Sequence, residues 1–238
     1  MTTEKKVALV TGANKGLGLE IARQLGKQGI VVAIGARDVA KGEAAAALLK
    51  SEGIDAHAVK LDVMNAEDVG ALPAFFESKF GRLDILVNNA GVNHDFEGEV
   101  TVDTFRRTFE ANVFAPYALT QALLPLLKAS PAGRIVNHSS SLGSLQLVKT
   151  ENFGAFLTPA YTSSKAALNM LTVVASKHLA GTNVKINSAH PGWVKTDMGT
   201  DAAPLEVEQG AKTAVRLATL PEDGPTGGYF HLEEALPW

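Results

Sequence analysis

Two stretches of the 238-residue sequence carry residue types at spacings that suit chemistry on a bound ligand. One is the run TGANKGLG at residues 11–18, and the other is the pair Tyr161 and Lys165. Residues four apart on a helix project from one face, so the phenol and the ammonium should be neighbours. A free tyrosine has a pKa near ~10, and an adjacent ammonium should lower that pKa toward the neutral range. The pair therefore predicts a phenol that transfers a proton.

The glycine run has the spacing G-x-x-x-G-x-G, formed by Gly12, Gly16 and Gly18. It lies between an apolar run and an amphipathic stretch, which predicts a strand, a turn and a helix. Gly12 permits the tight turn, Gly16 lets the backbone approach a phosphate, and Gly18 lets the helix pack closely on the sheet. The free N–H groups of the helix would then face a pyrophosphate. This pattern predicts a dinucleotide site.

The end of the second apolar run indicates which dinucleotide binds. An acidic residue about 20 residues after the glycines would bind the 2′-hydroxyl of NAD. Here the run ends in Arg37, and Asp38 comes one residue late. Arg37 suits a 2′-phosphate, and Lys15, with Asn14 as a polar neighbour, adds a second cation, so NADP is favoured over NAD. Alternatively, Arg37 is an ordinary surface residue and Asp38 caps the next helix.

These residues need an alternating framework to position them. Short apolar runs without period-two alternation begin the units, and stretches with helical spacing follow. The runs are 7–10, 30–34, 57–61, 85–87, 134–137 and 184–187. Repeated units of this kind predict an α/β fold, a Rossmann-type doubly wound parallel sheet of about seven strands with helices on both faces. We expect residues 1–238 to form one dinucleotide-binding domain whose C-terminal half builds the substrate site.

The helical stretches follow these runs, and prolines interrupt two of them. We expect helices from residue 17, over 39–50, after Asn65, and over 102–128, 159–180 and 205–220. Pro73 should kink the third helix or end its first half, and Pro116 should bend the fourth.

Composition narrows the function classes. The net charge is −3 with no basic stripe, which argues against nucleic acid as a partner. The chain has no cysteine and no histidine spacing that suits a metal, so we expect no metal site. No apolar run approaches the ~18 residues of a membrane span. We expect a cytoplasmic protein with no membrane partner, and we expect the acidic cluster 95–99 to be a solvated loop.

Further motifs complete a pattern in a fixed order. After the glycine run come NNAG at 88–91, serines at 139–141, Y-x-x-x-K at 161–165, and Pro191 with Gly192. With these motifs the chain resembles the short-chain dehydrogenase/reductase family over essentially its whole length. The Asn14-Lys15 pair and the turn 36–38 are most similar to the NADPH-dependent carbonyl reductase branch.

The resemblance implies roles for four catalytic residues. Tyr161 would protonate the substrate carbonyl, Ser140 would hydrogen-bond it, and Lys165 would hold the nicotinamide ribose. Asn112 would hold a water that links the lysine to solvent, or would bond backbone at a helix distortion. Ser139 is the alternative to Ser140, because three serines in a row blur the register.

The resemblance also implies the residues that hold NADP(H). Asp62 and Thr196 could instead only cap turns. The full expected set is Gly12, Asn14, Lys15, Gly16, Leu17, Gly18, Arg37, Asp62, Val63, Asn89, Ala90, Gly91, Tyr161, Lys165, Pro191, Gly192, Val194 and Thr196.

One departure from the family concerns the segment before Tyr161. Ser140 and Tyr161 are 21 positions apart, which is longer than in many members, and residues 149–159 account for the excess. This insertion lies beside the expected substrate mouth and leaves open whether the protein is a monomer or a homo-oligomer. His94 is a candidate for substrate contact, and Tyr117, Phe153 and Trp193 are candidates for an apolar pocket.

Together these features predict an NADPH-dependent reductase of a ketone or aldehyde, which also acts reversibly as an alcohol dehydrogenase on a small molecule. Two alternatives stay open. The chain could be a nucleotide-binding sensor or scaffold with little catalysis, or it could share the fold with epimerase or enoyl reductase chemistry.

Overall fold

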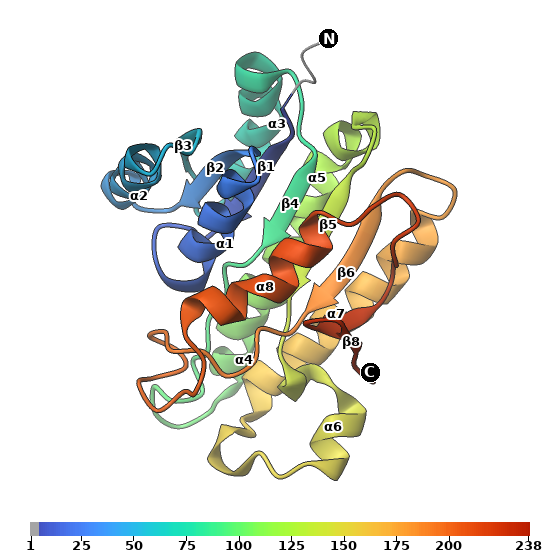
Figure 1. Cartoon of the computed structure of the whole chain (residues 1–238). Helices are drawn as coiled ribbons and strands as arrows, with labels where there is room; N and C mark the ends of the chain where they lie inside the picture. The colour runs from blue at the N-terminus through green and yellow to red at the C-terminus, as the bar shows by residue number, and fades with distance from the viewer. Residues whose placement is uncertain (1–4) are drawn as a thin grey trace.

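The centre of the computed structural model, which describes residues 5–238, is a sheet of eight strands (Figure 1). Its order is β3-β2-β1-β4-β5-β6-β7-β8. The first seven strands are parallel, and the two-residue β8 pairs antiparallel with β7. The strands are β1 Val7–Thr11, β2 Val31–Ala36, β3 Ala56–Lys60, β4 Ile85–Asn88, β5 Arg134–His138, β6 Lys185–Ala189, β7 Tyr229–His231 and β8 Glu234–Ala235.

The order in which strands are added to the sheet switches sides at β1, because β2 and β3 lie on one side of it and β4 begins the other side. In open α/β sheets, ligands bind at such a switch point, outside the carboxyl ends of the strands. Glycines 12, 16 and 18 follow β1 at this edge. The fold therefore places the glycine run where a ligand crevice is expected.

Helices cover both faces of the sheet, which confirms the predicted doubly wound fold (Figure 1). The apolar core on one face joins α1, α2 and α8 to the strands. The core on the other face joins α3 and α5, with part of α7. The helices are α1 Gly16–Lys27, α2 Val39–Ser51, α3 Ala66–Phe80, α4 Val102–Phe109, α5 Ala115–Ala129, α6 Leu145–Thr150, α7 Pro159–His178 and α8 Val207–Ala218.

Unbroken apolar runs behave as strands that are covered on both sides. Every residue of β1 and of β2 is buried. Side chains on both faces of these strands therefore enter a core. For this reason the strands show no alternation of polar and apolar residues in the sequence. Among residues 5–238, none of the helices is both long and apolar enough to span a membrane.

Pro73 does not end its helix, and the break expected at Pro116 lies just before that residue. Helix α3 continues through Pro73, because Val69, Leu72 and Phe76 are buried against the sheet and hold the helix on both sides of the missing N–H. The predicted helix over 102–128 is interrupted before Pro116 rather than at it. A π-helical turn, Glu110–Phe114, separates α4 from α5, and Pro116 lies in the first turn of α5, where a proline is tolerated.

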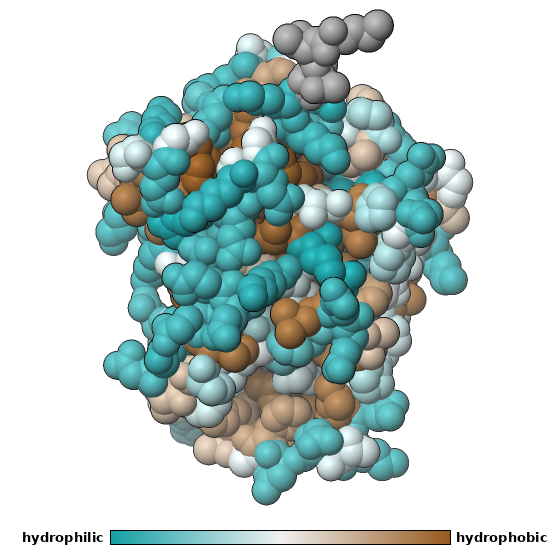
Figure 2. Space-filling model, in the orientation of Figure 1, coloured by the Kyte–Doolittle hydropathy of each residue, from teal (hydrophilic) through white to brown (hydrophobic). Residues whose placement is uncertain are grey.

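The insertion forms its own small unit at the carboxyl edge of the sheet (Figure 1). It contains the last two residues of α6 and a 3-10 turn, Gly154–Phe156, which the sequence did not predict. Its apolar side chains Phe156 and Leu157 face solvent, and so does Leu145 at the start of α6, at 76% exposure. Figure 2 shows white to brown surface gathered at this lower end of the molecule. The insertion therefore presents an apolar surface beside the crevice.

The tight approach at Gly18 gives a stability prediction. A Cβ at this position would lie 2.5 Å from Nδ2 of Asn89 and 2.6 Å from the carbonyl oxygen of Gly12. Because one of these atoms is backbone, Gly18→Ala should lower the free energy of unfolding by about 1–3 kcal/mol, measured by urea denaturation. Gly70→Ala in α3 is the control, since nothing lies within 4 Å of its Cβ position. That variant should be unchanged or slightly stabilised, and equal losses in both variants would contradict the packing argument.

Candidate active site

The carboxyl ends of three neighbouring strands are joined by one chain of hydrogen bonds. The Thr11 hydroxyl, at the end of β1, accepts from the backbone N–H groups of Asn89 (3.0 Å) and Ala90 (2.9 Å) after β4. Oδ1 of Asn89 lies 3.1 Å from Nδ1 of His138 in β5. The His138 carbonyl accepts from Nζ of Lys165 at 2.8 Å. The glycine run and Lys165 are therefore held in one network.

The predicted catalytic side chains meet at this edge. Tyr161, in the first turn of α7, is 9% exposed, and the Ser140 side chain after β5 lies close enough to its phenol to lower the pKa of that group. Nζ of Lys165 lies 5.5 Å from the centroid of the Tyr161 ring. Ser139 is buried, and its hydroxyl has no partner among the described residues. Of the two serines that the sequence left open, Ser140 is the one beside the phenol.

A glycine at position 143 lets the helix approach the serine turn. A Cβ on Gly143 would lie 2.7 Å from the backbone carbon of Lys165. The Gly143 carbonyl also accepts from Nδ2 of Asn169 at 3.1 Å. The three-residue spacing from Ser140 to Gly143 thus has a packing reason, because only glycine allows α7 to lie this close.

Asn112 lies in the π-helical turn and is 1% exposed. Its Oδ1 accepts from the Val92 N–H at 2.9 Å, and its Nδ2 donates to the Val92 carbonyl at 2.9 Å. Nδ2 also donates to Oγ of Ser164 in α7 at 3.0 Å. Both sequence interpretations of Asn112 therefore stay compatible, since it bonds backbone at a helix distortion and lies against the catalytic helix.

Burial controls the protonation states of the site. It raises the pKa of Tyr161 to about 12, and the nearby Ser140 hydroxyl acts in the opposite direction. Burial lowers the pKa of Lys165 to about 8 and that of His138 to about 3. For the protein's own groups, removal of the phenol from water dominates the pKa of Tyr161, and the lowering expected from the ammonium together with an oxidised nicotinamide stays a prediction. Near neutral pH the phenol is protonated, His138 is neutral, and Lys165 is mostly charged.

The glycine run forms a cradle that suits phosphate. Gly12 and Gly16 adopt positive φ values of 64° and 54°. Helix α1 begins without a side-chain cap and without an acidic residue in its first turn. Its first N–H groups and its dipole are therefore available to an anion. Arg37 is exposed at the end of β2 and makes no ion pair within residues 5–238. These features fit a dinucleotide that carries an extra phosphate.

The segment after β6 lies against this cradle. Asp197 forms an ion pair with Lys15, and Lys15 lowers the pKa of Asp197. The Cγ2 atom of Thr196 is 3.8 Å from the place of a Cβ on Gly16. The Thr196 hydroxyl accepts from the Gly199 N–H at 3.1 Å, so it also caps a turn. Lys15 is therefore a cation beside the cradle that already has a carboxylate partner.

Two acidic residues cap local structure, as the alternative interpretations held. Oδ1 of Asp62 accepts from the Met64 N–H at 3.1 Å. Asp38 accepts from the Lys41 N–H at 3.1 Å and caps α2. Asp38 thus acts within its own helix, while Arg37 beside it stays exposed.

Aromatic side chains bridge the insertion and the segment after β6. The rings of Phe156 and Trp193 meet edge to face, with centroids 5.0 Å apart. Nε1 of Trp193 donates to the Gly199 carbonyl at 2.7 Å. Tyr117 is 54% exposed, and Phe153 is half-buried. Of the predicted pocket candidates, Trp193 is the one that contacts an aromatic ring of the insertion.

His94 belongs to a cluster of polar side chains that it forms with Glu97 and Arg107. Its Nδ1 lies 2.7 Å from Oε1 of Glu97 and 3.2 Å from a guanidinium nitrogen of Arg107. The side chain of Glu97 is exposed. These contacts account for the His94 ring as part of a surface ion-pair network.

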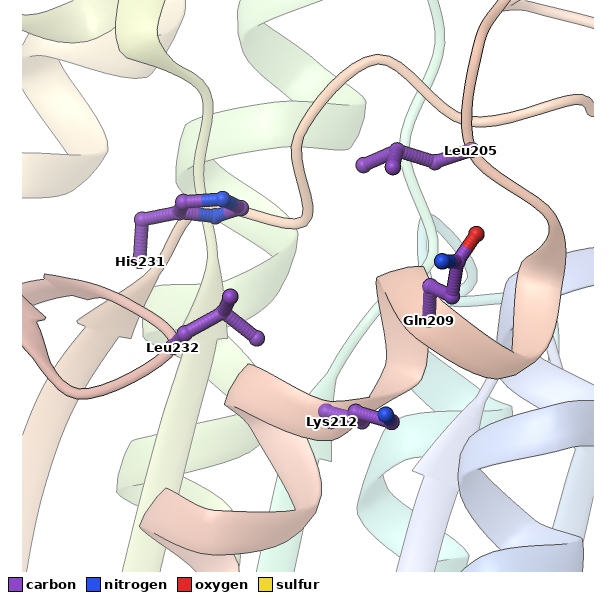
Figure 3. A pocket seen from close by; sticks show the side chains of 5 residues that line it. All are labelled: Leu205, Gln209, Lys212, His231 and Leu232. Carbon is purple, nitrogen blue, oxygen red and sulfur yellow. The ribbon is translucent and has the colours of Figure 1, made fainter.

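A separate cavity of about 140 Å³ lies between α8 and the turn from β7 to β8, next to Leu205 of the segment that follows β6 (Figure 3). Figure 3 shows Leu205, Gln209, Lys212, His231 and Leu232 around it. Its volume is below the roughly 300 Å³ of common ligand sites. None of the predicted catalytic residues lines it, so it does not belong to the catalytic centre.

Sequence reasoning missed one residue at the site. The expectation of a solvated acidic loop over 95–99 is wrong for Asp95, which is 7% exposed. Its carboxylate accepts from the backbone N–H groups of Ala160 (3.0 Å) and Tyr161 (2.8 Å). Its partners are 65 and 66 residues away in the chain, so no local signal in the sequence could have identified them.

The switch-point cradle, with Ser140 beside the buried Tyr161 and Lys165, defines a dinucleotide-dependent α/β oxidoreductase. The family model for short chain dehydrogenases matches residues 6–206. The chain therefore belongs to the short-chain dehydrogenase/reductase family, as the sequence motifs predicted, and to its carbonyl reductase-like branch.

Similar proteins cover the full chain. The (−)-isopiperitenone reductase of Mentha piperita is 35% identical, over 99% of this chain and 99% of that protein. Carbonyl reductase (NADPH) 1 of Sus scrofa is 33% identical, over 100% of this chain and 96% of that protein. The structure of an NADPH-bound carbonyl reductase from chicken fatty liver matches with a TM-score of 0.84 and 31% identity, over 99% and 100% of the two chains.

The depressed pKa of Lys165 predicts a pH-dependent stability. Its folded value is about 8, whereas an unfolded lysine titrates near ~10.4. Between these values the unfolded chain binds more protons, so the cost of burying the charge is greatest below pH 8 and falls as pH rises. Lys165→Met should therefore be more stable than the parent protein at pH 7, by up to about 3 kcal/mol.

Urea denaturation at pH 7 and at pH 9.5 checks this, and the difference between variant and parent should shrink at the higher pH. Lys177→Met is the matched control, since Lys177 is an exposed lysine of the same helix. An advantage of Lys165→Met that is equal at both pH values would contradict the assignment to a buried charge.

Proposed function

We propose that the protein reduces the carbonyl of a ketone or aldehyde to an alcohol with NADPH, and catalyses the reverse oxidation. One observation carries the proposal. A buried Tyr161 phenol that keeps its proton at neutral pH lies beside Ser140, next to Lys165 and the phosphate cradle. The relatives named isopiperitenone reductase and carbonyl reductase support the same reaction class.

NADP(H) is the cofactor, and the chain's own residues suit it. The first turn of α1 would hold the pyrophosphate through its free N–H groups. Lys15 and Arg37 would hold the 2′-phosphate, with Asn14 beside them. Asp62, Val63, Asn89, Ala90, Gly91, Pro191, Gly192, Val194 and Thr196 complete the proposed binding residues around the same crevice.

NADPH supplies a hydride to the carbonyl carbon when it is bound. The Tyr161 hydroxyl donates its proton to the carbonyl oxygen, and the Ser140 hydroxyl donates a hydrogen bond to the same oxygen as charge develops there. The Lys165 ammonium stabilises the phenolate left on Tyr161 and binds the nicotinamide ribose. Asn112 holds a water that links Lys165 to solvent. Burial raises the pKa of Tyr161 and thereby keeps the acid protonated for the reductive direction.

The proposed substrate is an apolar small molecule rather than a nucleic acid. Phe156 and Trp193 meet beside the crevice, and Leu145 is exposed in α6, just before the insertion. Burial of apolar substrate surface against these side chains would favour binding by roughly 25 cal/mol per Å². We assign the whole chain, 1–238, to one domain. Its C-terminal half supplies most of the proposed substrate site. A chain without cysteine also suits the reducing cytoplasm, where we expect it to act.

Replacement of the two cations tests the cofactor assignment. Lys15→Ala and Arg37→Ala together should raise the Kd for NADPH at least tenfold, about 1.4 kcal/mol, and leave the Kd for NADH within twofold. Titrations that follow the fluorescence of each reduced cofactor measure both values. An equal increase in the Kd values for NADPH and NADH would mean that these side chains do not bind the 2′-phosphate.

Replacement of the acid tests the chemistry. Tyr161→Phe should lower kcat on a ketone panel by about 10²–10⁴-fold and leave the Kd for NADPH within a few fold, because only the transferable proton is lost. Ser140→Ala should lower kcat about 10²-fold or more. Ser139→Ala is the matched control and should keep kcat. Full turnover by Tyr161→Phe would exclude the proposed mechanism.

A further inference from the structure

The first turn of α7 is capped from outside its own segment. Pro159 has no N–H, and the next two N–H groups, of Ala160 and Tyr161, both donate to the carboxylate of Asp95. The N-cap residue Thr158 makes no side-chain cap, and its buried hydroxyl has no partner among the described residues. Asp95 therefore satisfies the free donors that a helix start normally offers to its own N-cap.

The same loop reaches Tyr161 by a second route. The backbone of Val92 is bound at both polar groups by the Asn112 side chain. Asn112 donates to Oγ of Ser164 at 3.0 Å, and Ser164 donates to the carbonyl of Tyr161 at 2.7 Å. The N–H and the carbonyl of Tyr161 are thus both fixed, directly or through two side chains, to the segment 92–95.

Asp95 is itself held in place. Its backbone N–H donates to Oδ1 of Asn93 at 3.1 Å, which closes a tight turn. The carboxylate lies where the positive end of the α7 dipole favours negative charge. Gly91, at the start of this loop, passes Lys165, since a Cβ there would lie 3.6 Å from Nζ. The loop that lies beside the catalytic lysine therefore also carries the cap of the catalytic helix.

We propose that Asp95 is a positioning residue that ties the 92–95 loop to α7 and holds the Tyr161 phenol at the distance and angle needed for proton transfer. This inference rests on the proposed role of Tyr161 as the acid. Asp95 acts through the backbone of Tyr161 and does not touch the substrate. Any displacement of the loop on the substrate side is transmitted to the acid.

Asp95→Asn tests the proposal with little change in volume. The amide has one acceptor oxygen, so one of the two α7 N–H groups would face an NH₂ donor. We expect kcat on a ketone of the panel to fall about 10- to 100-fold, because small misplacement of a reacting group is costly. The KM for NADPH should stay within twofold.

Asn65→Ala is the matched control. Oδ1 of Asn65 accepts from the N–H groups of Glu67 (2.9 Å) and Asp68 (3.0 Å), so it caps two donors of α3 in the same way. Helix α3 packs on α5. This variant should lose stability and keep kcat at saturating NADPH. If Asp95→Asn also loses stability but keeps kcat within twofold, Asp95 is an ordinary cap and the proposal is wrong.

A second variant, in which the capping carboxylate is moved into the start of α7, distinguishes a positioning role of Asp95 from a capping role. In the Asp95→Ala chain, Thr158→Asp offers a carboxylate to the same two N–H groups from within the helix start. We expect stability to return and kcat to stay low, because the loop is no longer tied to α7. Recovery of kcat together with stability would overturn the coupling between loop and acid.

Amide hydrogen exchange keeps this test independent of the reaction. In Asp95→Asn, exchange at residues 160 and 161 should accelerate at least tenfold relative to the parent protein, with exchange in α3 unchanged. If the parent protein reduces no ketone with NADPH, the proposed function fails. Unchanged exchange at these two residues, in contrast, excludes the positioning role whether or not the reaction is found.

Discussion

The hydrogen bonds that run from Thr11 through Asn89 and His138 to Lys165 connect everything else in the site. They join the ends of β1, β4 and β5, which parallel pairing already places side by side. Each link joins residues at or directly after the ends of these strands, so the distance between cradle and lysine follows largely from the sheet. Residues on three separate strands must therefore be in place before the site exists.

The sequence predicted the parts of the site that depend on local patterns. The glycine spacing at 12, 16 and 18, the unbroken apolar strands and the cap at Asp38 each arise from interactions within a few residues. The number of strands was nearly right, and the short antiparallel β8 was missed because two residues carry no periodicity. Family resemblance selected Ser140, and its position beside the Tyr161 phenol agrees with that choice.

The remaining features depend on contacts between distant segments. The acidic cluster that contains Asp95 has the composition of a solvated loop, and only the packing of the loop against α7 buries it. The tyrosine pKa was expected to fall because a lysine lies four residues away, but burial acts more strongly and in the opposite direction. The effect of Pro73 depended on how firmly its neighbours pack on the sheet. In each case tertiary burial overrides a correct local argument.

The π-helical turn that carries Asn112 has a consequence for changes in chain length. Each residue of an α-helix advances the side-chain direction by about 100°. The turn holds one residue more than a regular helix would, which sets the register of all that follows in α5. Deletion of a single residue between 110 and 114 would restore a regular helix and rotate either Asn112 or the α5 core residues away from their partners. The length of this turn is therefore constrained separately from the identity of its residues.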